Sequence, residues 1–317
     1  MITNSKFNHY VQALSIAKDK RQNSLNLHYL MISQNEQHFF HQFKKANTFS
    51  DIRSLSKTVM TILLGYIIEH DSQKTLNLDT YVYPILAKHY QLTNTNNLAY
   101  LQQIQIRHLL THTIGYQDVL LMRQDLLKLE TSDYVEYLLN YPIVHAPGTH
   151  YLYSNAGFYL LSVVLQLYLK QDLDHYLQET LFKDLDITDY KWEKYGDYLA
   201  GATRLWLFPD DLMKFGQLLL DDGLYQGKRI VSKEWITIMK TKTTQTPHVD
   251  HPQRLFRRYG YGYGVWVAKD EGIFFGLGTD GQALIIVPKR NMVILTLAHQ
   301  VDTAPLHTIL NQIVEDS

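Results

Sequence analysis

The distribution of short apolar segments along the chain is the feature that most constrains its fold. Such segments lie near the N-terminus and return near the C-terminus, at 25–32, 37–43, 259–267, 273–278, 282–287 and 292–298. The N-terminal pair alternates as a β-hairpin does. Gly, Asp and Pro residues separate the C-terminal segments, which is typical of an antiparallel meander of three or four strands. Both ends of the chain are therefore expected to build one α+β lobe.

Helical spacing dominates the rest of the sequence. The strongest helix is expected at 54–70, and the others at 3–20, 104–111, 119–140, 155–170, 173–183, 209–222, 233–240 and 303–315. This order predicts an α+β fold with an antiparallel sheet flanked by helices. Residues 1–75 and 191–317 would form the lobe with the sheet, and residues 76–190 a mostly helical subdomain. The active site is expected in the cleft between them.

Composition excludes several classes of function. With 317 residues, the chain is long enough to bury a core without a disulfide or a metal. Its 30 Lys and Arg residues balance 31 Asp and Glu residues, so little attraction to nucleic acid or to an anionic membrane is expected. The absence of cysteine excludes thiol catalysis and cysteine-ligated zinc. No apolar run has the length of a signal-peptide core at the N-terminus or of a membrane span, so a soluble cytoplasmic protein is expected.

Ser54 and Lys57 form a Ser-x-x-Lys pattern at the start of the helix predicted over 54–70. Residues three apart share a helix face, so the serine hydroxyl and the lysine amine are expected to meet. A lysine buried near a helix N-terminus is driven toward its neutral form, which accepts the hydroxyl proton. The pattern also occurs at Ser15 and Lys18, where it indicates only a surface helix pair. Ser54 differs because its helix is apolar on all sides and must be buried.

Two further segments carry groups that suit acyl chemistry. Tyr153-Ser154-Asn155 follows a Pro-Gly turn and precedes the apolar helix predicted over 155–170. A phenol near a lysine serves as a proton relay, and an amide both donates and accepts hydrogen bonds. The alternative is a capping asparagine beside a packed tyrosine. The glycines of 276–281 predict close backbone approach, with the N–H of Thr279 directed at a substrate oxygen, or else a hairpin turn at 280–281.

Three other patterns receive structural interpretations. His108 and His112 have metal-ligand spacing, but the glutamate of zinc proteases is missing, so a hydrogen-bonded pair is expected. The glycine-rich segment 259–264 lacks the lysine and helix of a phosphate loop, and is expected to be a twisted aromatic strand. A short basic cluster is formed by Arg254, Arg257 and Arg258, and these side chains are expected to lie on the solvated surface.

Taken in order, these segments resemble the serine β-lactamase and penicillin-binding-protein superfamily, in particular its class C β-lactamase and esterase-like branch. The resemblance covers about residues 45–300. It rests on Ser54-Leu-Ser-Lys57, Ile106–Thr113 with Gly115, Pro147-Gly148, Tyr153-Ser-Asn155-Ala-Gly157, Asp210–Gly227, Tyr261–Gly264, and Gly281-Gln282 with Pro288. It implies a β-lactamase/transpeptidase-like fold, with an antiparallel sheet flanked by helices and a helical subdomain.

The resemblance also implies a role for each site residue. Ser54 would be the acylated nucleophile and Lys57 its base. Tyr153 would transfer protons, and Asn155 would hold the acyl amide or carbonyl. The oxyanion hole would consist of the N–H groups of Ser54 and Thr279. No metal or organic cofactor is implied, because this chemistry uses only side chains and water.

The third motif departs from the superfamily pattern. Its usual Lys-Thr-Gly or His-Thr-Gly aligns with Gly276-Leu277-Gly278, so only the last glycine, Gly278, is retained. The lost side chains hold the substrate carboxylate in β-lactams and D-alanyl peptides, and Asp280 would repel an anion further. The leading hypothesis is therefore a serine hydrolase acting on a small-molecule or peptide-like ester or amide. The alternatives are a β-lactamase or penicillin-binding D,D-peptidase, and a catalytically silent protein that binds a peptide or cell-wall fragment.

Overall fold

The computed structural model describes residues 1–44, 49–72, 74–131, 133–246, 255–256, 259–268 and 272–317. The chain divides into two compact units, Met1–Leu55 with Trp206–Ser317 and Ser56–Leu205. The sequence places these divisions after residues 75 and 190. In the structure they fall after Leu55 and Leu205, so the helix that carries Lys57 belongs to the second unit.

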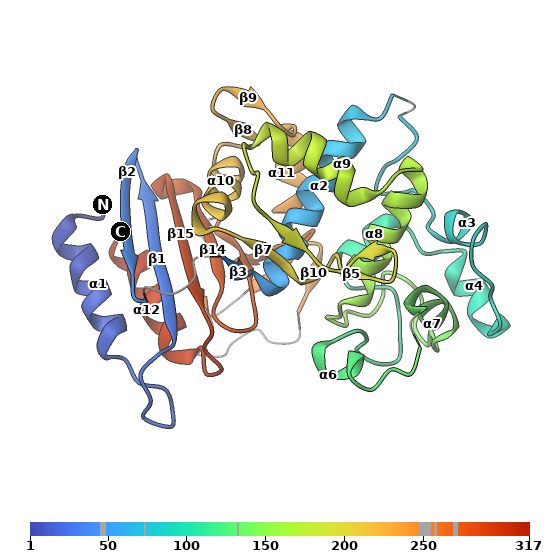
Figure 1. Cartoon of the computed structure of the whole chain (residues 1–317), viewed down its shortest axis with the longest axis horizontal. Coiled ribbons are helices and arrows are strands. Elements are labelled where there is room, and N and C mark those ends of the chain that lie inside the picture. The colour runs from blue at the N-terminus through green and yellow to red at the C-terminus, as the bar shows by residue number, and fades with distance from the viewer. Residues whose placement is uncertain (45–48, 73, 132, 247–254, 257–258, 269–271) are drawn as a thin grey trace. The chain divides into compact units, whose positions relative to one another are not determined.

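The first unit is built on an eight-stranded antiparallel sheet (Figure 1). Its strand order is β10-β11-β12-β13-β14-β15-β1-β2. The strands are β1 Leu27–Gln34, β2 Gln37–Gln42, β10 Thr244–Gln245, β11 Tyr259–Tyr261, β12 Trp266–Ala268, β13 Phe274–Leu277, β14 Ala283–Val287 and β15 Met292–Ala298. β1 pairs with β15, with Leu30 opposite Thr296, so the expectation that both ends of the chain form one lobe is confirmed.

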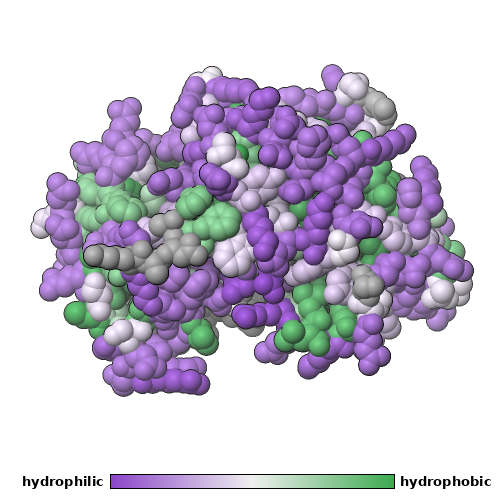
Figure 2. Space-filling model, viewed as in Figure 1, coloured by the Kyte–Doolittle hydropathy of each residue, from purple (hydrophilic) through white to green (hydrophobic). Residues whose placement is uncertain are grey.

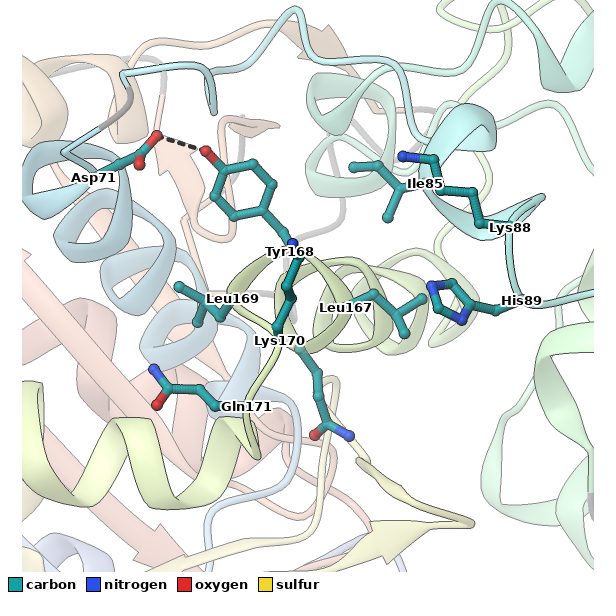
Figure 3. Close-up of a pocket in the computed structure, with 10 residues that line it drawn as sticks. Asp71, Ile85, Lys88, His89, Leu167, Tyr168, Leu169, Lys170 and Gln171 are labelled. Carbon is teal, nitrogen blue, oxygen red and sulfur yellow. Dashed lines mark hydrogen bonds between the residues drawn. The ribbon is translucent and has the colours of Figure 1, made fainter.

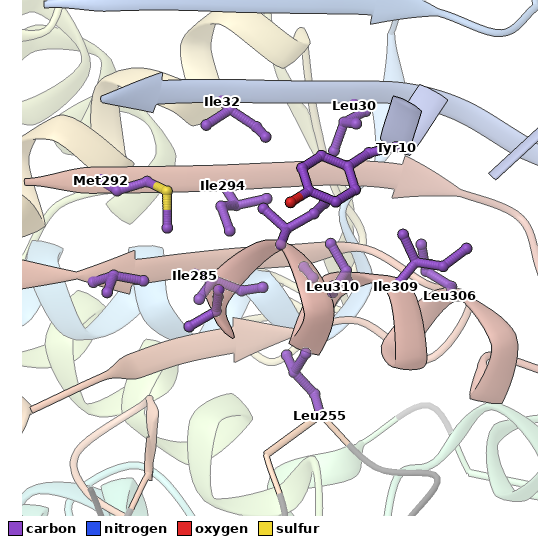
Figure 4. Packing of buried hydrophobic residues seen from close by; sticks show 14 of the residues in the cluster. Tyr10, Leu30, Ile32, Leu255, Ile285, Met292, Ile294, Leu306, Ile309 and Leu310 are labelled. Atoms are coloured by element: carbon purple, nitrogen blue, oxygen red, sulfur yellow. The ribbon is translucent and has the colours of Figure 1, made fainter. Parts of the chain in front are cut away.

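Helices cover both faces of this sheet because its buried strands are apolar on both sides. Helices α1 (Asn4–Ile16) and α12 (Ala304–Asp316) pack over one face, where Leu310 contacts a core that includes Ile294 (Figure 4). Helix α10 (Pro209–Leu220) packs against β14 and β15 near Val293. Successive strand residues point to opposite faces, so α10 covers the face opposite α12. The remaining elements of this unit are α11 Lys233–Met239, β3 Ser50–Asp51, η1 Arg53–Leu55, β8 Leu224–Tyr225, β9 Lys228–Arg229 and η4 Pro288–Arg290.

The second unit is mostly helical. Its longest helices, α2 (Ser56–His70) and α8 (Ala156–Leu169), contact each other and are largely buried. The other elements are α3 Tyr83–Leu86, η2 Thr95–Asn97, α4 Leu98–Leu101, α5 Ile106–Leu110, α6 Arg123–Leu126, α7 Tyr134–Asn140, α9 Leu173–Leu177, η3 Gln178–Phe182, β4 Lys191–Trp192, β5 Lys194–Tyr195 and β6 Tyr198–Leu199. Strand β7, Leu205–Leu207, crosses the division between the units and pairs with β3.

Several predicted elements are wrong in their extent. The helix expected over 3–20 ends at Ile16. The helix expected over 119–140 is two short helices, because Asp133 starts α7 by accepting a hydrogen bond from the N–H of Glu136. The strand expected over 259–267 is two strands, because the N–H of Gly262 bonds to the carbonyl of Val265 in a turn.

Polar residues make up most of the molecular face seen in Figure 2, with apolar residues in small groups between them. Among the described residues, no helix has both the length and the apolar character needed to cross a membrane.

Candidate active site

Lys57 is the most deeply buried cation of the site, with 1% of its surface exposed. It lies in the first turn of α2, whose residues are buried without interruption from Ser56 to Ile67. Its Nζ donates hydrogen bonds to Oδ1 of Asn155 at 2.8 Å and to the carbonyl of Ala202 at 3.2 Å. Both of these partners are neutral acceptors that hold the amine in place.

This burial has an electrostatic consequence. Removal from water penalises the ammonium form, and it lowers the pKa of Lys57 to about 7. Near neutral pH a large share of the Lys57 side chain is therefore the neutral amine, the form that can accept a proton. Such an amine is the kind of base that the sequence analysis expects at this position.

Asn155 is fixed at both ends of its side-chain amide. Its Oδ1 accepts from Lys57, and its Nδ2 donates to the carbonyl of Leu121 at 2.9 Å. Leu121 has a φ of 58°, a left-handed conformation that is unusual for leucine and that places its carbonyl beside the amide. Asn155 precedes α8 and makes no side-chain capping bond, so the capping alternative is wrong.

Tyr153 completes the group around Lys57. The Lys57 Nζ lies 4.8 Å from the centre of the Tyr153 ring. The tyrosine ring also packs against His112, at 4.4 Å between ring centres. Burial, and secondarily the charge of Lys57, hold the pKa of His112 well below its usual value. His112 is therefore a neutral packing partner rather than a second cation.

Ser54 is the middle residue of η1, and η1 leads directly into α2. It is half-buried, whereas Lys57 is fully buried. The other Ser-x-x-Lys pattern behaves differently: Ser15 donates to the carbonyl of Val11, and Lys18 bonds to Ser24. Both of those residues are exposed, so their surface location is confirmed, but α1 ends at Ile16 and the two residues do not form a helix pair.

Gly278 and Thr279 lie just after β13, in the turn to β14. Gly278 donates to the carbonyl of Gln282 at 2.7 Å, and Thr279 is exposed. A Cβ on Gly278 would lie 2.4 Å from Oε1 of Gln282 and 3.0 Å from Cβ of Arg53. Only glycine fits there, and η1 with Ser54 lies against β13. The hairpin and the close backbone approach expected from sequence therefore occur together.

Arg53, the residue directly before Ser54, contacts this turn through its side chain. The sequence did not indicate a role for it. Its Nη1 contacts Oδ2 of Asp51 at 2.7 Å, and its Nε contacts Oδ2 of Asp280 at 3.0 Å. Asp51 also accepts from the N–H of Arg53, whose backbone is left-handed with a φ of 53°. Asp280 is 227 residues away in sequence, so no local pattern could have revealed the pair.

The other candidate patterns are structural. His108 accepts from the N–H of Gln105 and caps α5. The helix ends at Leu110, so the metal-ligand spacing of His108 and His112 is not realised on one helix. Segment 259–264 spans β11 and a turn. The basic cluster Arg254, Arg257 and Arg258 lies outside the described residues.

A hollow of about 760 Å³ lies elsewhere in the second unit (Figure 3). It is lined by residues at the C-terminal ends of α2 and α8, where Tyr168 donates to Asp71 at 2.7 Å. Lys57 and Asn155 lie at the opposite, N-terminal ends of the same two helices. A helix rises 1.5 Å per residue, so this hollow is about 20 Å from the Lys57 group and is not part of it.

The chain and its fold are similar to those of several known proteins. The chain is 26% identical to an uncharacterized protein of Alkalihalophilus pseudofirmus, in a match that spans 62% of this chain and 61% of that protein. The chain thus spans less than two thirds of the length of this curated relative. The structure superposes on the octameric penicillin-binding protein homologue from Pyrococcus abyssi, with a TM-score of 0.77 and 16% identity over 99% of this chain and 78% of that one.

A second similar structure is EstCE1, a hydrolase with promiscuous acyltransferase activity. Its TM-score is 0.74, with 16% identity over 96% of this chain and 98% of that one. These likenesses show the fold, which is β-lactamase/transpeptidase-like as the sequence predicts. The Beta-lactamase family model matches residues 29–316, nearly the whole chain. The chain therefore belongs to the Beta-lactamase family.

Proposed function

We propose that this protein is a serine hydrolase that forms an acyl-enzyme from an ester or amide. The observation that carries the proposal is the state of Lys57. A buried amine with a pKa of about 7, held by two neutral acceptors, is suited to remove a proton from a serine hydroxyl. Ser54, one helical turn before it in the chain, is the proposed nucleophile.

The proposed reaction has two steps. In the first, Ser54 Oγ attacks the carbonyl carbon while its proton passes to Lys57 Nζ. The N–H groups of Ser54 and Thr279 stabilise the resulting oxyanion. The leaving group then departs with a proton delivered through Tyr153, and an ester of Ser54 remains. In the second step, water attacks the carbonyl carbon of this ester and gives up a proton through Tyr153 and Lys57. The bond from the acyl carbon to Ser54 Oγ then breaks, that proton returns to Oγ, and the carboxylic acid product is released.

Asn155 has a more specific role in this proposal than the resemblance alone gave it. Both ends of its amide are engaged, by Lys57 and by the Leu121 carbonyl. We therefore assign it first as a positioning residue for the Lys57 amine. To hold a substrate amide or carbonyl as well, it would have to exchange one of these two bonds.

Local charge favours a substrate without a carboxylate. Gly276 and Leu277, on β13, offer neither the cation nor the hydroxyl that the superfamily uses there. The nearby Arg53 contacts two carboxylates, those of Asp51 and Asp280. A neutral ester or amide is the substrate class that this environment suits.

Hydrolysis of a neutral nitrophenyl ester by wild type, Ser54→Ala and Ser15→Ala tests the proposal. Ser54→Ala is expected to lose at least about 10³-fold in kcat, because no other group replaces the nucleophile. Ser15→Ala, in the exposed second pattern, is expected to retain full activity. Full activity of Ser54→Ala would contradict the proposal.

A fluorescent penicillin separates the alternatives. Little or no labelling of wild type is expected at concentrations where the ester is turned over. Rapid labelling that Ser54→Ala abolishes would instead identify a β-lactamase or penicillin-binding peptidase. A folded wild type that neither hydrolyses esters nor reacts with an acylating probe would be a silent binding protein.

A further inference from the structure

We infer that Asp280 is a specificity-determining residue: its carboxylate occupies the Arg53 guanidinium and so excludes substrates that carry a carboxylate beside the scissile bond. The inference rests on the proposed function, because it concerns which acyl donors Ser54 accepts. The residues from which it is argued all belong to the first unit.

The position of Arg53 makes it the natural receptor for an anion. It directly precedes Ser54, and its Cβ lies against Gly278, one residue before the proposed oxyanion donor Thr279. An arginine so placed would usually bind a substrate carboxylate by charge-assisted hydrogen bonds. Here the Nε donor already contacts Oδ2 of Asp280 at 3.0 Å. The chain thus supplies its own carboxylate where an anionic substrate would bind.

The charges around Arg53 do not leave an excess of positive charge. Asp51 contacts Nη1, so two carboxylates contact one guanidinium. His299 also faces this cluster, with its Nδ1 4.0 Å from Oδ2 of Asp280. The formal charges of the Asp51, Arg53 and Asp280 side chains sum to −1. A substrate carboxylate would meet repulsion there and would find the Nε donor occupied.

The backbone of the turn does not depend on the Asp280 side chain. The N–H of Asp280 donates to Oε1 of Gln282, and its carbonyl accepts from the N–H of Gln300. Gln282 is in turn fixed by a bond from its Nε2 to the carbonyl of Ala298. The carboxylate can therefore be removed while main-chain bonds keep Thr279 in place. A substitution at Asp280 therefore tests the effect of its negative charge and of its bond to Arg53 Nε, and not the folding of the turn.

The experiment compares two nitrophenyl esters, one with a free carboxylate and one with that carboxylate blocked by methylation: mono-4-nitrophenyl glutarate and its methyl ester. The ratio of kcat/KM for the anionic to the neutral ester is measured for wild type, Asp280→Asn and Asp280→Ala. Removal of one like charge at this range is expected to raise the ratio about tenfold. Asp280→Ala, which also vacates the Nε donor, should raise it at least as much as Asp280→Asn.

Asp222→Asn is the matched control. Asp222 is also an ion-paired aspartate of the first unit, bound to Lys240 and Lys233 in a different turn. It changes the net charge equally, so its ratio should stay at the wild-type value. In the double variant Arg53→Met with Asp280→Ala, the gain should disappear, because no guanidinium remains to bind the anion.

The outcomes separate the inference from the proposed function. If the ratio is unchanged in both Asp280 variants, or rises equally in Asp222→Asn, the inference is wrong even though Ser54-dependent ester hydrolysis persists. If the gain survives in the double variant, repulsion alone acts and Arg53 is not an anion receptor. If hydrolysis of the neutral ester does not require Ser54, the proposed function itself fails.

Discussion

At the scale of single residues, the two Ser-x-x-Lys patterns of the chain lie in different environments. Ser54-x-x-Lys57 leads into a helix that is buried on all sides, whereas Ser15 and Lys18 are exposed and lie on either side of the end of α1 at Ile16. The sequence distinguishes them because the apolar residues that follow Ser54 leave no face for solvent. It does not identify the Asn155 bond to Lys57 or the Arg53 bond to Asp280, because each joins segments about 100 or more residues apart.

The pKa of Lys57 predicts a pH profile for acylation. The base must be neutral, and its neutral fraction rises with pH through about 7. The rate should therefore increase about tenfold per unit below pH 7 and level off above it. Asn155→Asp places a carboxylate at the position of the 2.8 Å bond to Nζ, which favours the ammonium form. Its rising limb should move to higher pH by about one to three units.

The same profile distinguishes positioning from general damage. Asn291→Asp, in the exposed turn before β15, adds the same charge and should leave the midpoint where it is in wild type. If Asn155→Asp only disrupted the site, its pH–rate profile would have a lower plateau and the same midpoint as wild type. That result would contradict the assignment of Asn155 as the positioning residue for the amine.

At the scale of elements, long periodic segments were predictable and very short ones were not. Helices α2, α8 and α10 match their predictions within about two residues, because each buries a continuous apolar surface. The two-residue strands β3 and β10 show no periodicity, since they are defined by their pairing partners alone. For the same reason, the meander was predicted but its extension to eight strands was not.

Helix α10 offers a test of close packing between a helix and a sheet. A Cβ on Gly216 would lie 2.5 Å from Cγ1 of Val293 and 3.0 Å from a methyl of Leu284. Gly216→Ala should therefore destabilise the protein by about 1–3 kcal/mol, although alanine favours an isolated helix by about 1 kcal/mol. Urea denaturation measures the change. The added substitution Val293→Ala should reverse part of the loss.

A gain in stability on Gly216→Ala would contradict this packing. That result is expected only where a helical glycine faces solvent, so that propensity alone determines the outcome.

At the scale of the whole molecule, the two ends of the chain complete one structure. β1 pairs with β15 across about 260 residues, and Tyr10 of α1 donates to Asp316 at the end of α12 at 2.9 Å. The composition at both ends predicted a shared lobe, but neither the register of β1 on β15 nor the contact of α1 with α12 has a local signal. Such long-range pairings are determined by the fit of complete apolar faces.

Leu310 tests how much the C-terminal helix contributes to this core. It is a fully buried residue of α12, in the cluster that includes Leu30 and Ile294. Leu310→Ala should lower the free energy of unfolding by about 2–5 kcal/mol, and Leu310→Met by less than about 1.5 kcal/mol. Circular dichroism during urea denaturation measures both. Equal and small decreases in the free energy of unfolding for both variants would contradict the close packing of α12 against the sheet.

The central claim is that Ser54 is acylated because Lys57 accepts its proton. The most direct test is the position of the covalent adduct after reaction with a fluorophosphonate, determined by intact mass and then by peptide mapping. The account predicts one adduct per chain, located on Ser54, absent in Ser54→Ala and formed more slowly below pH 7. An adduct on another residue, or an undiminished adduct in Ser54→Ala, would contradict it.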